Sequence, residues 1–116
     1  MFDFEKLEVY QLAKALVVDT LRTIYSNNNI DPYIRDQWRR ASMNILLHLS
    51  DGTGRMNPAD KKHCITLARS SVFECVAILE VLSQLEHIPL KEAQGFYDRY
   101  ETISKMLLGM FRSHSE

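Results

Sequence analysis

Apolar residues recur three or four positions apart along almost the whole chain, with polar residues between them, and no stretch shows sustained alternation. This spacing is typical of amphipathic helices, so the pattern predicts an all-α protein. The first helix should span about residues 4–25, with a core face of Leu7, Tyr10, Ala13, Leu16, Val17, Thr20, Leu21 and Ile24. Residues 26–29, Ser-Asn-Asn-Asn, should end it, because short polar side chains compete for backbone hydrogen bonds and favour turns.

Each of the three prolines stands just before a new helical run, in the dipeptides Asp31-Pro32, Asn57-Pro58 and Ile88-Pro89. Proline at the first helical position loses no hydrogen bond, and Asp and Asn are good N-cap residues. These signals predict three further helices, at about residues 32–51, 58–86 and 89–112.

Four helices joined by short connections are expected to form an antiparallel up-and-down four-helix bundle. The 116 residues hold 46% apolar and 25% charged side chains, which is ordinary globular composition. A chain of this length buries roughly two thirds of its unfolded surface, enough for one core. Since no linker or repeat divides it, residues 1–116 are predicted to form a single domain.

The second helix carries more apolar residues than one core face needs. Met43, Leu46 and Leu47 lie away from its main apolar stripe. Either this helix is buried on most sides or it offers a second face to another subunit, and the second interpretation is preferred. The three residues are therefore candidates for an oligomer interface.

Two features bear on location. No window approaches 18 uninterrupted apolar residues, and the first residues carry acids where a signal peptide would carry a basic and then an apolar run. A cytoplasmic protein without a membrane segment is expected.

Cys64 and Cys75 are too far apart along one helix to bond to each other and are predicted to be reduced core residues.

The net charge is −1, but it is unevenly distributed. Residues 35–69 hold seven basic and three acidic side chains, a balance of +4 in a chain that is otherwise −5. This asymmetry indicates either one basic surface or a solvated helical face with a cationic bias.

Residues 51–55, Asp-Gly-Thr-Gly-Arg, could in principle cradle a phosphate. A phosphate-binding P-loop, however, needs a preceding strand, wider glycine spacing and a Lys-Ser/Thr pair, which are missing here. The segment is interpreted as a turn in which Gly52 ends the helix in a left-handed conformation. It would project Arg55, Lys61 and Lys62 at one end of the bundle.

Metal chemistry is weakly suggested by two short spacings, Asp60-x-x-His63 and His48-x-x-Asp51. Di-iron bundles use such pairs together with further carboxylates from the other helices, and no matching set is present. No metal or other cofactor is expected.

Helical ribonucleases of the HEPN class carry an arginine and a histidine with four to six residues between them. Here Arg40 and His48, and likewise Arg55 and His63, enclose seven residues. No Ser, His and acid grouping can be argued from spacing either. A non-catalytic protein is expected.

Several motifs occur in the order found in one family: FEKLEVY at residues 4–10, RDQWRRAS at 35–42, DGTGR at 51–55 and ARSSVFEC at 68–75. Together they resemble the four-helix bundle proteins encoded in bacterial 23S ribosomal RNA intervening sequences. The accessory variability protein of diversity-generating retroelements is similar to the same family. The resemblance implies a homopentameric barrel without established catalysis, and for the retroelement branch it implies a reverse transcriptase and RNA as partners.

The matched charged residues allow two roles, phosphate contact or ion pairing between the second and third helices. Pairing is favoured for the set Arg39, Arg40, Asp51, Arg69 and Glu74. The cations expected to remain free are the nucleic-acid-binding candidates, Arg35, Arg55, Lys61 and Lys62. The sequence thus predicts an oligomeric binding or scaffold protein for structured RNA or an RNA-handling partner. The alternative is a protein-protein interaction scaffold with no nucleic-acid role.

Overall fold

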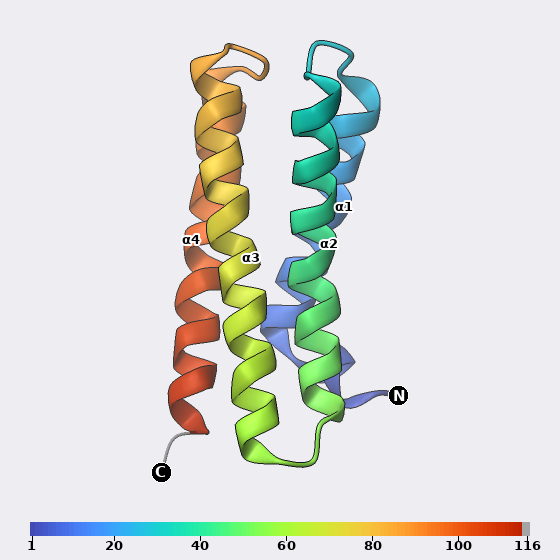
Figure 1. Cartoon of the computed structure of the whole chain (residues 1–116), viewed down its shortest axis with the longest axis vertical. Coiled ribbons are helices and arrows are strands. Elements are labelled where there is room, and N and C mark those ends of the chain that lie inside the picture. Colours follow the sequence, from blue (N-terminus) through green and yellow to red (C-terminus); the bar gives the residue numbers. More distant parts are fainter. Residues whose placement is uncertain (115–116) are drawn as a thin grey trace.

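The computed structural model describes residues 1–114 as four α-helices preceded by a short 3₁₀ helix. The elements are η1 (Asp3–Lys6), α1 (Glu8–Ser26), α2 (Pro32–Gly54), α3 (Pro58–Gln84) and α4 (Leu90–Ser113). Successive helices run in opposite directions along a body of 45 × 25 × 22 Å (Figure 1). The predicted all-α, antiparallel up-and-down bundle is therefore confirmed.

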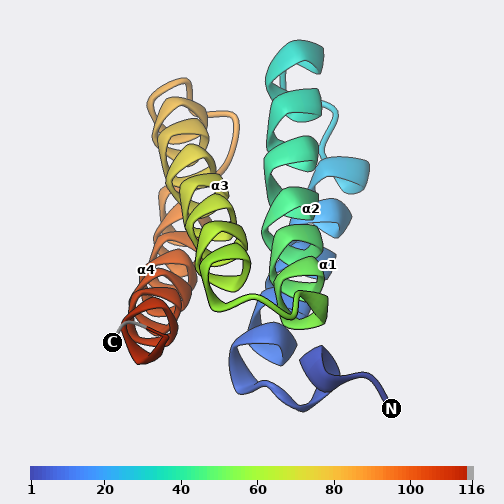
Figure 2. The same cartoon turned by 60° about the horizontal axis from the view of Figure 1, so that its bottom comes forward.

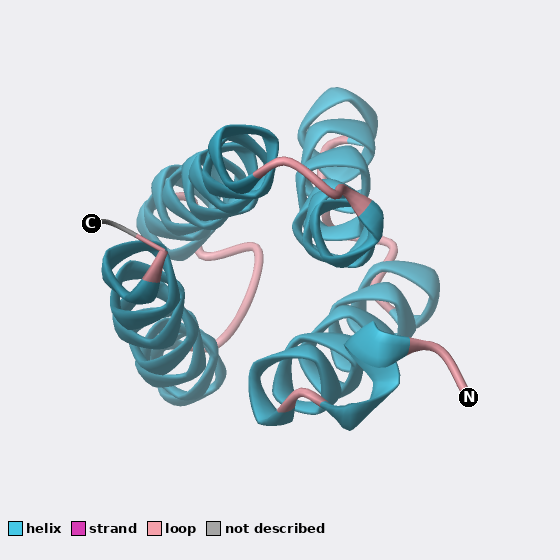
Figure 3. Ribbon diagram, turned by 90° about the horizontal axis from the view of Figure 1, so that it is seen from below, coloured by secondary structure: helices cyan, strands magenta, loops and turns pink. Residues whose placement is uncertain are grey.

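The helices sit at the four corners of the bundle (Figure 3). Within the described residues, α2 packs against α1 and α3, and α4 packs against α3 and α1. Consequently α2 and α4 lie on one diagonal, and α1 and α3 on the other. None of these helices is long and apolar enough to cross a membrane.

The starts of α2 and α3 follow the predicted signals. The Asp31 carboxylate accepts hydrogen bonds from the backbone N–H groups of Tyr33 and Ile34, at 3.0 and 3.2 Å. The Asn57 side-chain oxygen accepts one from the N–H of Ala59, at 2.8 Å. Each cap satisfies backbone donors that have no partner within the helix.

Helix ends differ from the predicted boundaries by up to four residues. Leu7 is extended, so residues 3–6 form η1 and α1 begins only at Glu8. At its far end α3 stops two residues early, where Glu86 takes a positive φ of 60°. The His87 N–H then bonds the Leu82 carbonyl at 2.9 Å, which is the pattern of a Schellman C-cap built on a residue other than glycine.

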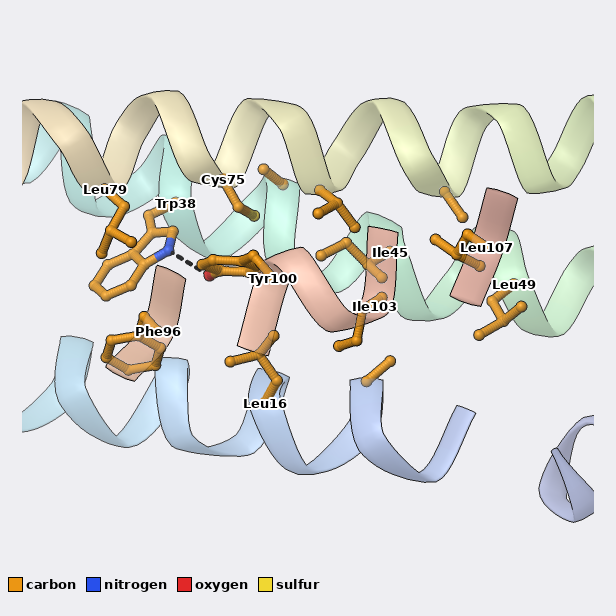
Figure 4. Close-up of a cluster of buried hydrophobic side chains, with 14 of the residues drawn as sticks. Leu16, Trp38, Ile45, Leu49, Cys75, Leu79, Phe96, Tyr100, Ile103 and Leu107 are labelled. Carbon is orange, nitrogen blue, oxygen red and sulfur yellow. Dashed lines mark hydrogen bonds between the residues drawn. The ribbon is translucent and has the colours of Figure 1, made fainter. Parts of the chain in front are cut away.

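The core is centred on Trp38 of α2 and Tyr100 of α4, which are both fully buried. The Trp38 Nε1–H donates to the Tyr100 hydroxyl at 2.9 Å (Figure 4). Phe96 stands edge-on to the Trp38 ring, with centroids 5.3 Å apart. Every helix contributes buried apolar residues around this cluster, including Leu16, Ile45, Leu79 and Leu107.

Replacing Tyr100 with Phe should lower the free energy of unfolding by about 1–3 kcal/mol, because the buried indole N–H loses its acceptor. Urea denaturation measures the difference. The matched control is Tyr97→Phe, since Tyr97 is partly exposed and its hydroxyl makes no hydrogen bond within residues 1–114. The control should stay within about 0.5 kcal/mol of the parent, and an equal loss in both variants would contradict the role given to the Trp38–Tyr100 bond.

Candidate nucleic-acid interface

Gly52 brings α2 and α3 into close contact near the turn that joins them. A Cβ atom at this position would lie 2.8 Å from the Cβ of Cys64. The prediction that Gly52 adopts a left-handed conformation is wrong, because α2 continues through Gly54 and no glycine in residues 1–114 has a positive φ. The glycine allows two helices to approach closely and does not end a helix.

Arg55 directly follows the last residue of α2 and is paired with an acid of that helix. Its Nε and Nη2 groups donate to the two carboxylate oxygens of Asp51 at 3.2 and 3.0 Å. The guanidinium holds the pKa of Asp51 below its ordinary value, and the carboxylate raises the pKa of Arg55. Both side chains are about half exposed, so the pair is solvated and still open to other partners.

Lys61 and Lys62, in the first turns of α3, are also engaged. The Lys61 ammonium donates to the carbonyl oxygen of Thr53 at 3.1 Å, which caps the last turn of α2. The Lys62 ammonium lies over the Phe111 ring of α4, 4.6 Å from its centroid. None of these three candidates is therefore a free cation. All three belong to the α2–α3 turn or the first turns of α3, and this turn lies at one end of the bundle (Figure 2).

Arg35 lies apart from them. It precedes Arg55 by twenty residues, nineteen of them within α2, so at 1.5 Å per residue the two side chains start about 30 Å apart. The Arg35 Nη2 group donates to the carbonyl oxygens of Asn27 and Ile30, at 3.4 and 3.1 Å, and ties the α1–α2 loop to the helix. The four predicted binding residues therefore do not form one patch.

The predicted ion pairs between α2 and α3 are not formed among the described residues. Arg39 and Arg40 both bond Asp36, one turn away on the same helix. Arg69 turns toward α4, where its Nε donates to the Ser104 carbonyl at 3.3 Å. Neighbours three or four residues apart on one helix already face each other, so they pair without spanning the gap between helices.

Glu74, an acid predicted to join the second and third helices by ion pairing, makes no ion pair within residues 1–114. It lies on the exposed side of α3. The Arg69 guanidinium instead lies over the Phe73 ring, 4.9 Å from its centroid.

The interface candidates on α2 differ in exposure. Leu47 is 53% exposed, Met43 is half-buried, and Leu46 is half-buried against the core. Leu47 and Met43 thus lie on the outward side of the helix, whereas Leu46 belongs partly to the bundle itself.

Two adjoining hollows between α3 and α4, of about 350 and 400 Å³, share Arg69 and Phe73 in their walls. We call them together the α3–α4 groove. Its apolar lining includes Phe73, which is 57% exposed, Ala77, Tyr97 and Leu108. The sequence reasoning missed this groove, although Phe73, Ala77 and Val81 recur every four residues off the core face of α3.

The two cysteines of the described residues are not joined to each other. Both cysteines are free and buried, as predicted, and burial raises the pKa of Cys75 to about 11. Burial also raises the pKa of Cys64, whose Sγ lies 3.8 Å from an Asp51 oxygen. In the same part of the chain no three His, Cys, Asp or Glu side chains come together as metal ligands.

These features define a small four-helix bundle protein with paired cations gathered at one end. A family model described as 23S rRNA-intervening sequence protein matches residues 5–109, and the chain belongs to this family. The resemblance in its motifs is thereby confirmed.

A crystal structure of a protein with unknown function from the S23 ribosomal protein family of Bacteroides thetaiotaomicron has the same fold. It superposes with a TM-score of 0.84 at 17% identity, covering 89% of this chain and 97% of that chain. A search among curated proteins gives no match.

Replacing Gly52 with Ala should lower the free energy of unfolding by about 1–3 kcal/mol, because the added methyl group overpacks the α2–α3 contact at Cys64. Gly95→Ala is the matched control, since Gly95 lies within α4 and nothing stands within 4 Å of its added Cβ. There the change should stabilise by about 0.5–1 kcal/mol through helix propensity. A stabilised Gly52→Ala variant would contradict the close approach.

Replacing Arg55 with Gln should raise the pKa of Asp51 toward its ordinary value, which a carbon-13 NMR titration of the carboxylate can measure. Because the folded-state pKa is lowered, the pair stabilises the fold above the ordinary carboxyl pKa and loses this contribution as pH falls through the folded value. The stability difference between parent and variant should therefore shrink in acid. An unchanged Asp51 pKa would show that another group holds the carboxylate.

Proposed function

We propose that this chain is a cytoplasmic, non-catalytic, oligomeric protein that binds structured RNA, directly or beside an RNA-handling protein such as a reverse transcriptase. The family takes its name from intervening sequences of 23S rRNA, which supports an RNA context. The binding surface would be the cationic end, defined as Arg55, Lys61 and Lys62 at the α2–α3 turn.

The observation that carries this proposal is that all three cations are held in place yet keep donors to spare. Arg55 uses two of its five N–H donors on Asp51, and Lys61 uses one of three on Thr53. A tethered side chain loses less rotamer freedom when it binds, so phosphate contact costs less ordering entropy. The Lys62 ammonium, held over Phe111, is similarly positioned.

One copy alone offers a weak electrostatic surface. The three cations at this end lie near the carboxylates of Asp51 and Asp60 and of Asp3, which lines a hollow with Lys61, so these six charges balance. Repeating the cationic end around an assembly would multiply weak phosphate contacts through effective concentration. Assembly is therefore part of the proposed mechanism.

The second candidate is a protein-interaction scaffold with no nucleic-acid role. The exposed apolar lining of the α3–α4 groove favours it, because groups of exposed apolar side chains mark protein contacts. The net charge of −1 also agrees with a protein partner.

Binding of the purified protein to a labelled RNA hairpin across a salt series tests the proposal. The triple variant Arg55→Gln, Lys61→Gln, Lys62→Gln should bind more weakly and with a shallower dependence on salt. The slope should fall by about 0.7–0.9 for each phosphate that the variant no longer neutralises.

A charge-matched control removes Lys14, Arg22 and Lys91 in the same way. These exposed cations lie on α1 and at the start of α4, away from the turn, so their replacement should leave the slope near that of the parent. Equal weakening in both triple variants would mean that only overall charge matters. No RNA binding by an assembled parent protein would favour the scaffold function.

A further inference from the structure

The rim of the α3–α4 groove is acidic. Glu74 and Glu80 make no ion pair within residues 1–114, and Glu101 is 3.9 Å from Lys105. The guanidinium that lines the groove, that of Arg69, is already used on Ser104 and Phe73. Arg69 and Lys105 offset two of the three carboxylates, so the rim keeps a net charge of −1, with Glu74 and Glu80 outside any ion pair of the described residues. An apolar floor with a rim of this sign suits an apolar helix face flanked by cations and disfavours RNA.

This chain carries such a face on α2. Arg40, Met43 and Leu47 follow one another at intervals of three and four residues, so they share one side of the helix, and Arg39 flanks them. We call these four residues the outer stripe of α2. Both arginines are at least half exposed, and although they share Asp36 they carry a surplus positive charge.

The stripe and the groove also stand at matching heights. Ser42 Oγ and Cys75 Sγ are 3.7 Å apart, which fixes the level of α2 against α3. Because α2 and α3 are antiparallel (Figure 1), residues that precede Ser42 lie at the same height as residues that follow Cys75. At 1.5 Å per residue, the Arg40 backbone lies about 3 Å from this level, and Glu80 lies about 7.5 Å from it on the same side. Glu74 lies about 1.5 Å from it on the opposite side, so Arg40 is between the two acids in height.

The apolar residues follow the same order. The backbones of Met43 and Phe73 lie about 1.5 and 3 Å from the Ser42–Cys75 level, on the side opposite to Arg40. A copy placed alongside by rotation about an axis parallel to the bundle keeps all heights. It would bring arginines opposite carboxylates and Met43 opposite Phe73 at once.

We propose that the outer stripe of α2 in one copy seats in the α3–α4 groove of a second copy. The stripe belongs to α2 and the groove lies between α3 and α4, so the contact is heterologous, and a pair of copies keeps one free stripe and one free groove. Repetition by rotation would place every cationic end on the same rim. This inference rests on the assembly part of the proposed function and names the two surfaces that would make it.

Two variants separate the surfaces. Leu47→Asp alters only the stripe and Phe73→Asp only the groove, so each alone should give mainly species smaller than the parent assembly, down to the 13.5 kDa chain, in light scattering. Mixed in equal amounts, they should form a dimer of twice that mass, because the intact stripe of the Phe73→Asp chain fits the intact groove of the Leu47→Asp chain. Such complementation is specific to a heterologous contact.

Leu12→Asp is the matched control, because Leu12 is a comparably exposed leucine on the outer side of α1; it should assemble like the parent. Circular dichroism confirms that each variant is folded. An assembled parent whose mass survives Phe73→Asp, or variants that stay monomeric when mixed, would overturn the groove as the counter-surface. A monomeric parent would instead remove assembly from the proposed function.

The charges provide a second test that does not disturb the apolar floor. Arg40→Glu and Glu80→Arg should each weaken self-association, and the double variant should restore it, because the exchange recreates the pair across the interface. Equal or additive weakening in the double variant would overturn the proposed register.

Discussion

The hydrogen bond between Trp38 and Tyr100 joins α2 and α4, which lie diagonally opposite each other in the bundle. Neighbouring helices also pack through apolar contacts, and the hydrophobic effect behind those contacts has no preferred direction. A buried N–H donor with one acceptor is less tolerant of slips along the axis, because losing that acceptor leaves a polar group unpaired away from water. The bond therefore sets the level of α2 against α4, and the Ser42–Cys75 contact sets the level of α2 against α3.

The charged surface is organised by short-range pairing. Arg39, Arg40 and Arg55 each bond an acid three or four residues away, and Lys61 bonds a carbonyl at the end of α2. Pairing of this kind holds cations in place without burying them. It leaves a cationic end at the α2–α3 turn and an acidic rim on the α3–α4 groove, two surfaces that would select different partners.

The site was less predictable than the fold because each of its charged side chains could bond any of several neighbours. Arg69 was predicted to join α2 and α3 by ion pairing, but its guanidinium lies over the Phe73 ring and its Nε donates to the Ser104 carbonyl of α4. The role of Gly52 was also not predictable from the sequence. Its sequence context predicts a helix end, and only the packing of α3 against α2 reveals that the position is small because Cys64 stands beside it.

The sequence by itself determined the four helices, the caps at Asp31 and Asn57, and the antiparallel bundle. These features depend on local hydrogen bonding and on the spacing of apolar residues, which can be read from neighbours along the chain. The tertiary structure alone decided the separation of Arg35 from Arg55, the partners of the arginines and the existence of the groove. Each of these depends on distances between residues far apart in sequence, and helical spacing carries no information about which helices become neighbours.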